Sequence, residues 1–351
     1  MTLLQWYESN RRSLPWRETK DAYRIWLSEI ILQQTRVAQG LDYYLRFVER
    51  WPTVTDLAAA SEEEVLKLWQ GLGYYSRARN LLKAARQVTE QMAGRFPTRY
   101  EDLIILKGVG PYTAAAIASF SSDEAVAVVD GNVYRVLSRL FDIDTPIDTT
   151  GGQKLFLRLA EEMLNRKKPG LHNQAMMELG ALVCTPATPR CGECPLHDKC
   201  LARTAATVSV RPVKQGKTRI RDRWLCYLLF KYKDRFWVRR RDAGDIWQGL
   251  WEFAGAETGA PVSGSEIRDL VRSFLSPDNQ TAVDSIVPVV KDLHHQLTHR
   301  LLHIDCFIVN LSCDVRPKGE YEQISWTNWA EKAIPKAIFD LNGKISPFFV
   351  P

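Results

Sequence analysis

The sequence predicts a multidomain protein in which an all-α domain, over residues 1–205, precedes an α/β domain over 224–351. Three observations support this prediction. The length of 351 residues corresponds to two domains, at about 150 residues per domain. Helix-start and helix-stop signals recur through the first part of the chain, whereas runs rich in β-branched and aromatic residues begin at residue 224. The basic segment between them, 206–223, contains Pro212 and Gly216 and is predicted to be a linker.

The helical domain shows its elements through capping signals. Ser61 followed by Glu64 is a capping box, which predicts a helix that stops at Gly71. Pro111 is a favoured first-turn residue and predicts the start of another helix. Further helices are expected over about 76–91, 131–141, 151–166 and 172–183.

The C-terminal domain begins with a predicted hairpin. Residues 224–231 and 235–239 have the composition of two strands joined around Lys233 and Asp234. A second capping box, Ser263 with Glu266, predicts a helix that reaches Leu275. The run 301–310 is rich in Ile, Phe and Val and predicts another strand, so we expect a mixed α/β domain.

Composition excludes several classes of protein. Hydrophobic residues make up 45% and charged residues 25% of the chain, which excludes wholesale disorder. No stretch approaches about 18 apolar residues, so no membrane span is expected, and no signal peptide is apparent. The net charge of +6 permits a nucleic-acid partner without requiring one. We therefore expect a cytoplasmic protein in a reducing compartment.

Four of the seven cysteines lie close together, with the spacing C-x6-C-x2-C-x5-C. Four thiolates at such short intervals can surround one metal centre, and both zinc and a [4Fe–4S] cluster accept four sulfurs. The spacing alone does not choose between these two metal centres. The predicted ligands are Cys184, Cys191, Cys194 and Cys200.

Two carboxyl groups are predicted to have opposite environments. On a helix, the neighbours of Glu29 three and four positions away are mostly apolar, so desolvation should raise its pKa. Asp130 is placed to cap the helix that follows, and the backbone N–H groups there should lower its pKa. A protonated acid with an ionised partner is the pair that glycosidic cleavage needs. Taken alone, Glu29 fits an ordinary solvated glutamate better than a catalytic acid, and Asp130 fits a plain helix cap better than a catalytic carboxylate.

A glycine-containing turn between two predicted helices looks like a helix-hairpin-helix. Gly108 and Gly110 allow the backbone to turn tightly and to approach a phosphate closely. The free amides at the start of the next helix would then face the anion. An ordinary turn between helices has a similar sequence, so this motif gains meaning only from the others.

Four histidines in the C-terminal domain raise the question of a second metal site. They are His294, His295, His299 and His303. We do not expect a metal there, because no carboxylate spacing accompanies these histidines. The sequence therefore assigns metal binding to the cysteine loop.

Taken in order along the chain, four features resemble the helix-hairpin-helix DNA glycosylase superfamily. They are the segment from Ser28 to Thr35, the glycine turn, the segment from Val129 to Val133 and the four-cysteine loop. Within the superfamily, the chain most resembles the A/G-specific adenine DNA glycosylases of the MutY type. The resemblance covers nearly the whole chain, because that family also carries a nudix-like C-terminal domain.

This resemblance implies a base-excision repair enzyme that removes adenine opposite 8-oxoguanine or guanine in double-stranded DNA. It implies a monomeric, nucleoid-associated protein with a six-helix barrel over about residues 22–130. Beside the barrel, residues 1–21 and 131–205 would form an iron–sulfur domain, with DNA in the cleft between the two. The family's cluster is [4Fe–4S], which decides between the two metal centres in favour of iron.

The resemblance also implies catalytic and binding roles for the residues of this sequence that match the family's motifs. Glu29 would protonate the adenine ring, and Asp130 would stabilise the oxocarbenium-like sugar with Asn132 beside it. Tyr112 lies where related bifunctional glycosylases have a Schiff-base lysine, so strand cleavage is expected to be absent or weak. The adenine must be flipped out of the duplex before its bond to the sugar can be reached. By the same resemblance, the residues that would contact the flipped adenine are Trp16, Arg17 and Gln174. Those that would insert into the base stack beside 8-oxoguanine are Gln34, Leu72 and Tyr74.

The resemblance also gives the C-terminal domain a role in recognition. Leu297, Thr298 and His299 stand where the family usually has a Phe-Ser-His triplet that reads 8-oxoguanine. Leu297 loses the ring contact, whereas Thr298 keeps a hydroxyl, so we expect Thr298 to read the opposite base with support from His299. The domain has no nudix catalytic box, so pyrophosphatase activity is not expected.

Three alternatives fit the sequence less well. An endonuclease III-like pyrimidine glycosylase with lyase activity is disfavoured by Tyr112 and by the additional C-terminal domain. A non-catalytic DNA-binding module would require Glu29 or Asp130 to be replaced. A nudix hydrolase with a DNA-binding extension would require the catalytic box.

Overall fold

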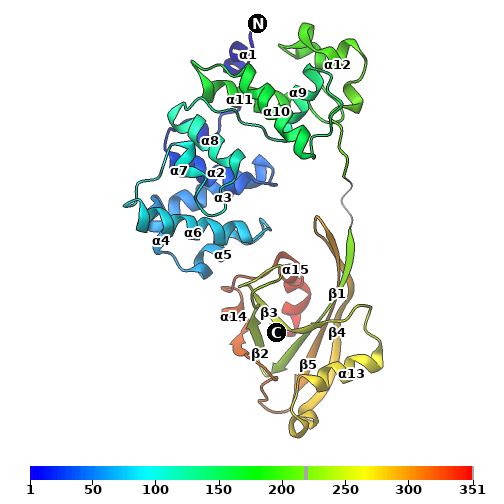
Figure 1. Ribbon diagram of the computed structural model, residues 1–351. Coiled ribbons are helices and arrows are strands. Elements are labelled where there is room, and N and C mark those ends of the chain that lie inside the picture. Colours follow the sequence, from blue (N-terminus) through cyan, green and yellow to red (C-terminus); the bar gives the residue numbers. More distant parts are fainter. Residues whose placement is uncertain (217–219, 350–351) are drawn as a thin grey trace. The chain divides into compact units, whose positions relative to one another are not determined.

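The computed structural model describes residues 1–216 and 220–349, and the chain divides into two compact units (Figure 1). The first unit combines Met1–Ala60 with the described chain from Asn80 to residue 216. The second combines Ser61–Arg79 with the described chain from residue 220 onward. The domain limits predicted from the sequence placed Ser61–Arg79 with the helical domain, whereas in the structure this segment packs with C-terminal residues.

The first unit is built from helices, and no strand occurs among its described residues. None of the helices described in the chain is long and apolar enough to cross a membrane. The helices of this unit are α1 (Leu3–Asn10), α2 (Ala22–Leu32), α3 (Val37–Arg50), α4 (Val54–Ala59), α7 (Tyr100–Leu103), α8 (Pro111–Ser122), α9 (Gly131–Leu140), α10 (Thr150–Met163), α11 (Pro169–Leu182), α12 (Leu201–Thr204) and most of α6 (Ser76–Gln91).

Several of these helices begin where the sequence predicts. Pro111 is the first residue of α8, and the predicted helices over 131–141 and 151–166 correspond to α9 and α10. The helix predicted over 172–183 begins three residues earlier, at Pro169. Proline fits that position because its fixed φ suits the first helical turn, where its missing N–H has no helical partner.

Residues from both ends of the first unit share one hydrophobic core. Trp6 and Tyr7 of α1 are buried against Val133 and Phe156, which belong to α9 and α10, and against Leu179 of α11. Burying large aromatic side chains is strongly stabilising, so this core fixes the N-terminus onto helices that lie more than a hundred residues later.

The segment before the C-terminal domain is bound to the first unit as far as residue 216. The Asp148 carboxylate accepts hydrogen bonds from the backbone N–H groups of Gln215 at 2.9 Å and Gly216 at 2.8 Å. The Ile147 N–H donates to the Val213 carbonyl at 3.0 Å. This part of the predicted linker therefore has defined partners.

The second unit contains a six-stranded sheet with the order β4-β5-β1-β3-β2-β6. Strand β1 pairs in parallel with β5, and the other neighbouring pairs are antiparallel. The strands are β1 (Arg221–Tyr232), β2 (Arg235–Arg240), β3 (Trp251–Glu257), β4 (Val283–Gln296), β5 (Arg300–Leu311) and β6 (Glu322–Ser325).

The predicted hairpin is confirmed, because Tyr232 pairs with Arg235 across a tight turn. The strand predicted over 301–310 corresponds to β5. Strands β3, β4 and β6 were not predicted. Strand β4 carries Pro288 and several exposed polar residues and shifts register three times along β5, which obscures its alternation in the sequence.

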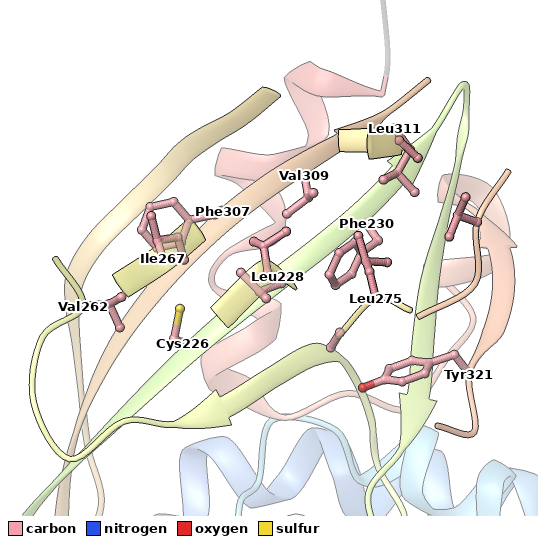
Figure 2. Close-up of a cluster of buried hydrophobic side chains, with 14 residues drawn as sticks. Cys226, Leu228, Phe230, Val262, Ile267, Leu275, Phe307, Val309, Leu311 and Tyr321 are labelled. Carbon is pink, nitrogen blue, oxygen red and sulfur yellow. The ribbon is translucent and has the colours of Figure 1, made fainter. Parts of the chain in front are cut away.

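Figure 2 shows the core on one face of this sheet. Cys226, Leu228 and Phe230 alternate along β1 and point to the same face, as the period of a strand requires. They pack against Ile267 and Val271 of α13 (Gly264–Ser273). The predicted capping box starts this helix, since Ser263 accepts a hydrogen bond from the Glu266 N–H and Glu266 accepts one from the Ser263 N–H.

Helix α5 (Glu62–Trp69) joins the C-terminal residues through polar contacts, and its predicted capping box is present. The Lys67 ammonium donates to the carbonyls of Ala330 at 2.6 Å and Lys332 at 3.0 Å. The Trp251 indole N–H donates to the Glu63 carboxylate at 3.0 Å. The short helices α14 (Trp326–Trp329), α15 (Lys336–Phe339) and α16 (Asn342–Ile345) complete the unit.

Candidate active site

A cavity of about 220 Å³ in the first unit brings together residues that the sequence singled out. They come from the N-terminal loop and from α2, α8, α9 and α11, so no single stretch of chain contains the site. The predicted residues that line this cavity are Trp16, Arg17, Glu29, Tyr112, Asp130, Asn132 and Gln174.

Glu29 lies on the buried face of α2, and only 8% of the residue is exposed. The Tyr112 hydroxyl donates a hydrogen bond to Glu29 Oε2 at 2.9 Å. Burial raises the pKa of Glu29 to about 7, because desolvation outweighs the hydrogen bond from Tyr112, and the nearby Asp130 carboxyl raises it further. The predicted direction is confirmed, so a large share of Glu29 is protonated near neutral pH.

Asp130 caps α9, as predicted. Its carboxylate accepts hydrogen bonds from the backbone N–H groups of Asn132 at 2.9 Å and Val133 at 2.7 Å, and from Asn132 Nδ2 at 2.7 Å. The prediction that its pKa falls is wrong, because burial raises the pKa of Asp130 more than these hydrogen bonds lower it. Asp130 nevertheless accepts three hydrogen bonds where Glu29 accepts one from Tyr112. We therefore take Asp130 as the carboxyl of the pair that ionises first.

Asn132 is held in place from its other side. Arg135 Nη2 donates to Asn132 Oδ1 at 2.9 Å and to the Gly180 carbonyl at 2.7 Å. A Cβ atom at Gly180 would lie 2.5 Å from Asn132 Cβ, so only glycine allows α11 to approach α9 this closely. The approach fixes Asn132, and Asn132 orients the Asp130 carboxylate.

Glu178 was missed by the sequence analysis, although it organises one wall of the cavity. Its side chain is fully buried and forms bidentate pairs with Arg12, at 2.9 and 2.6 Å, and with Arg17, at 2.9 and 2.7 Å. Burial alone would raise the pKa of Glu178, but the two guanidinium groups lower it to about 2. The arginines lie about 160 residues away in sequence, so the only local signal is one glutamate within the apolar run of α11.

Gln174 and Trp16 also line the cavity. The Tyr7 hydroxyl donates to Gln174 Oε1 at 2.6 Å, which leaves the amide Nε2 as the donor for another molecule. Trp16 is buried and packs edge-on against Tyr44, with 5.0 Å between the ring centroids. Both side chains are thereby held in fixed orientations.

The predicted glycine turn precedes α8 and matches its expected geometry. Gly108 has a φ of +79°, and a Cβ atom there would lie 2.7 Å from Asn80 Cβ. Gly110 occupies the cap position of α8, where no side chain covers the helix N-terminus, and no atom lies within 4 Å of a Cβ built there. The first amides of α8 are therefore open to an anion. Gln34, by contrast, is not among the residues that line the cavity around Glu29 and Asp130.

The four clustered cysteines all line a second, much smaller cavity of about 30 Å³. Its lining also includes the apolar Val183 and Val208 and the basic Arg139 and Arg203, and Arg139 Nη1 donates to Cys184 Sγ at 3.4 Å. Burial raises the pKa of the Cys194 thiol to about 11, so in the absence of a metal this thiol is protonated at neutral pH. Four sulfurs around one small space fit the ligand set of a four-thiolate metal centre.

The predicted lesion-reading residues lie in the second unit, around a cavity of about 550 Å³. Leu297, Thr298 and His299 form the turn between β4 and β5 and line this cavity together with Tyr74. The hydroxyls of Tyr74 and Thr298 are hydrogen-bonded to each other, a contact that the sequence analysis did not foresee. Leu72 is buried, with 7% of the residue exposed.

The Glu178 ion pairs predict a measurable effect on stability. Glu178→Gln should lower the free energy of unfolding by about 3 kcal/mol at pH 7, since the pKa of the carboxyl falls from 4.5 to about 2 on folding. A lowered pKa stabilises the fold above about pH 4.5, and this contribution disappears as the pH falls towards 2. Urea unfolding followed by circular dichroism at several pH values measures the difference.

Glu162→Gln is the matched control, because the Glu162 side chain is 63% exposed and its pair with Arg158 spans 3.7 Å. Exposed pairs contribute about 0–1 kcal/mol. Equal losses for the two variants would contradict a buried role for Glu178.

Two families of known proteins match different parts of the chain. Residues 27–161 match the HhH-GPD superfamily of base excision DNA repair proteins, and residues 225–341 match the NUDIX domain. Among solved structures, a thermostable thymine-DNA glycosylase is similar with a TM-score of 0.54 and 29% identity, over 58% of this chain and 94% of that one.

Two relatives among known proteins are adenine DNA glycosylases. The adenine DNA glycosylase of Buchnera aphidicola subsp. Schizaphis graminum is 34% identical over 311 residues, which cover 88% of this chain and 87% of that protein. The human adenine DNA glycosylase is 48% identical over 212 residues, which cover 58% of this chain and 39% of that protein. The chain therefore belongs to the adenine DNA glycosylase family, whose members hydrolyse N-glycosyl bonds in base excision repair.

Proposed function

We propose that this glycosylase acts as a monomer on double-stranded DNA and removes adenine that is mispaired with 8-oxoguanine or guanine, without cleaving the strand. One observation carries the proposal. A single cavity holds two carboxyl groups, the buried Glu29 and the partly buried Asp130, and their hydrogen bonds favour an acid at Glu29 and a carboxylate at Asp130. Cleavage of a bond between a sugar and a base needs this pair.

In the proposed reaction, Glu29 gives its proton to a ring nitrogen of the flipped adenine. The bond between the base and the sugar C1′ breaks, and its electron pair leaves with the base. The oxocarbenium-like sugar that remains faces the Asp130 carboxylate, whose negative charge stabilises it. Water then adds to C1′, and its proton passes to a carboxylate of the pair.

The absence of strand cleavage is supported by the residues around the carboxyls. Tyr112 occupies the position of the Schiff-base lysine in related bifunctional enzymes, and here its hydroxyl is bound to Glu29. No lysine is among the residues that line the cavity in the described part of the chain. The site thus offers no amine that could attack the sugar.

Adenine would be held by groups that are already oriented. Gln174 has a free amide donor because Tyr7 occupies its oxygen, and Arg17 is fixed by Glu178. The open N-terminus of α8, with Gly108 and Gly110 before it, would bind a DNA phosphate. Gln34 and Leu72 keep their assignment to the base stack on the family resemblance alone, and Leu72 would have to leave its buried position.

The cysteine loop would hold a [4Fe–4S] cluster through Cys184, Cys191, Cys194 and Cys200. When bound, such a cluster cross-links the loop through four Fe–S bonds. Residues of this chain tie the same loop to α9, since Arg135 donates to the Cys184 carbonyl at 2.6 Å and Arg139 to the Thr185 carbonyl at 2.7 Å. The cluster would thereby stabilise the helix that Asp130 caps.

The C-terminal domain, over 224–351, would recognise the base opposite adenine. Thr298 and Tyr74 already meet at one cavity, and both carry hydroxyls that can bond to the edge of an oxidised purine. His299 lies beside them and would support this contact.

The carboxyl pair predicts the kinetics of two variants. Glu29→Gln and Asp130→Asn should each lower single-turnover adenine release by at least about 10²–10⁴-fold, the usual cost of losing a general acid. Binding to the mispair, measured by gel shift, should persist. Because burial raises the pKa of Glu29 to about 7, release by the wild type should fall as the pH rises above 7.

Glu162→Gln serves as the control for a change of surface charge and should leave release unchanged. A wild-type rate that stays flat from about pH 6 to 9 would remove Glu29 from the role of acid.

The cysteine loop predicts a metal content. Purified full-length protein should contain about four irons per chain and absorb visible light, and Cys194→Ser should lose both. Cys313→Ser is the matched control, because Cys313 is exposed and lies outside the loop. Stoichiometric zinc without visible absorption would contradict the assignment of iron.

The turn at Thr298 predicts a change of preference. Thr298→Val keeps the shape and deletes the hydroxyl, so it should lower the preference for 8-oxoguanine over guanine by up to about tenfold, the value of one hydrogen bond. Tyr74→Phe should act in the same direction, whereas Thr281→Val, at an exposed threonine of the same unit, should not. Single-turnover rates of adenine release opposite 8-oxoguanine and opposite guanine measure this preference. Equal losses on both would indicate a folding defect, and unchanged rates would exclude a reading role.

A further inference from the structure

The outer edge of the C-terminal sheet carries a compact group of three metal-binding side chains. His294 on β4 pairs directly with His303 on β5, and Asp292 lies beside them. Asp292 Oδ1 is 2.7 Å from His303 Nδ1 and 3.0 Å from His294 Nε2. The three potential ligand atoms all lie within 4.8 Å of one another.

The sequence analysis rejected these histidines because it found no accompanying carboxylate, and that reasoning is wrong. Strand β4 was not predicted, so Asp292 and His294 were not recognised as neighbours of His303. The second imidazole comes from the neighbouring strand, which only the register of β4 on β5 determines.

The backbone at Asp292 is shaped to present its side chain. The strand is irregular between Val290 and Leu293, and Asp292 adopts a φ of +51°. The Asp292 N–H donates at 2.8 Å to the carboxylate of Asp305, which is itself buried. A left-handed aspartate within a strand is unfavourable unless surrounding contacts fix it, and such positions concentrate at functional sites.

A second set of contacts fixes His303. Its Nε2 atom is 3.1 Å from Asp222 Oδ1, while the Trp224 ring stacks on the imidazole at a centroid distance of 4.7 Å and an angle of 12°. Histidines that bind metals usually direct their second nitrogen to a carboxylate in this way, which fixes the ring and strengthens the ligand. His303 is mostly buried, but Asp292 and His294 are more than half exposed, which leaves an open side for water ligands.

We propose that Asp292, His294 and His303 bind one Zn²⁺ ion, with water completing its coordination. Two imidazole nitrogens and one carboxylate oxygen are a typical zinc donor set, whereas Mg²⁺ and Ca²⁺ prefer oxygen ligands alone. The ion would cross-link β4 to β5 a few residues before and after the turn at 297–299. This site is separate from the cysteine loop and from the catalytic cavity.

Isothermal titration of the iron-loaded, full-length protein with Zn²⁺ tests the proposal. We expect one zinc per chain, with affinity reduced at least about tenfold in Asp292→Asn and His294→Asn. Asparagine at 292 tolerates the left-handed backbone, so that variant should fold. Asp222→Asn should weaken binding by about 10–100-fold, the usual effect of losing the partner of a histidine ligand.

His295→Asn and Asp284→Asn are the matched controls, since they alter the same residue types on the same strand. His295 lies against Asp340, at 3.9 Å, and belongs to no metal-ligand group in the described chain. The iron content of every variant is measured in parallel, so that zinc entering the cysteine loop is detected.

A second readout is thermal unfolding, which Zn²⁺ should shift upward in the wild type and in the controls but not in Asp292→Asn. Absence of zinc binding, or binding that Asp292→Asn and His294→Asn retain, would overturn the proposal and leave these side chains as an ion-pair cluster only. Binding lost in Cys194→Ser but kept in Asp292→Asn would overturn it as well.

Discussion

The capped N-terminus of α9 is the constraint on which the catalytic unit depends. Asp130 accepts hydrogen bonds from two of its free N–H groups, and the same carboxylate would supply the negative charge in the proposed reaction. Further along the helix, Arg135 and Arg139 donate to carbonyls of the cysteine loop. One helix therefore holds both the Asp130 carboxylate and the cysteine loop in place.

Burial raises the pKa of both carboxyls in the cavity, so the site cannot separate an acid from a base by solvation alone. The separation comes from hydrogen bonding. Each N–H that points at Asp130 favours its ionised form, while Glu29 is left with the hydroxyl of Tyr112 in apolar surroundings. Once Asp130 is ionised, its charge also disfavours ionisation of Glu29. The cap of α9 therefore supports both proposed roles. It stabilises the negative charge of Asp130, and that charge favours the protonated form of Glu29.

Local signals in the sequence predicted the elements that depend on local chemistry. Capping boxes at Ser61 and Ser263, proline at residue 111 and the hairpin at Lys233 all have their physical cause within a few residues. The direction of the Asp130 pKa was wrong, since burial by distant segments outweighs the bonds of the cap. The role of Glu178 was missed because its arginine partners lie on another part of the chain. Strand β4 was missed because bulges and exposed polar residues obscure the alternation of apolar and polar side chains along it. The failures at Asp130 and Glu178 involve partners that are far away in sequence, whereas the failure at β4 comes from its irregular register and exposed residues.

The carboxyl cavity and the predicted lesion-reading turn lie in different units of the chain. All residues that line the carboxyl cavity belong to the first unit, whereas Tyr74 and Thr298 belong to the second. Tyr74 precedes α6, which begins in the second unit and continues into the first. A residue from the N-terminal half of the sequence thus folds with the C-terminal sheet and shares a hydrogen bond with its β4–β5 turn. The proposed recognition of the opposite base therefore uses residues of the second unit, whereas the contacts that hold Glu29 and Asp130 lie within the first unit.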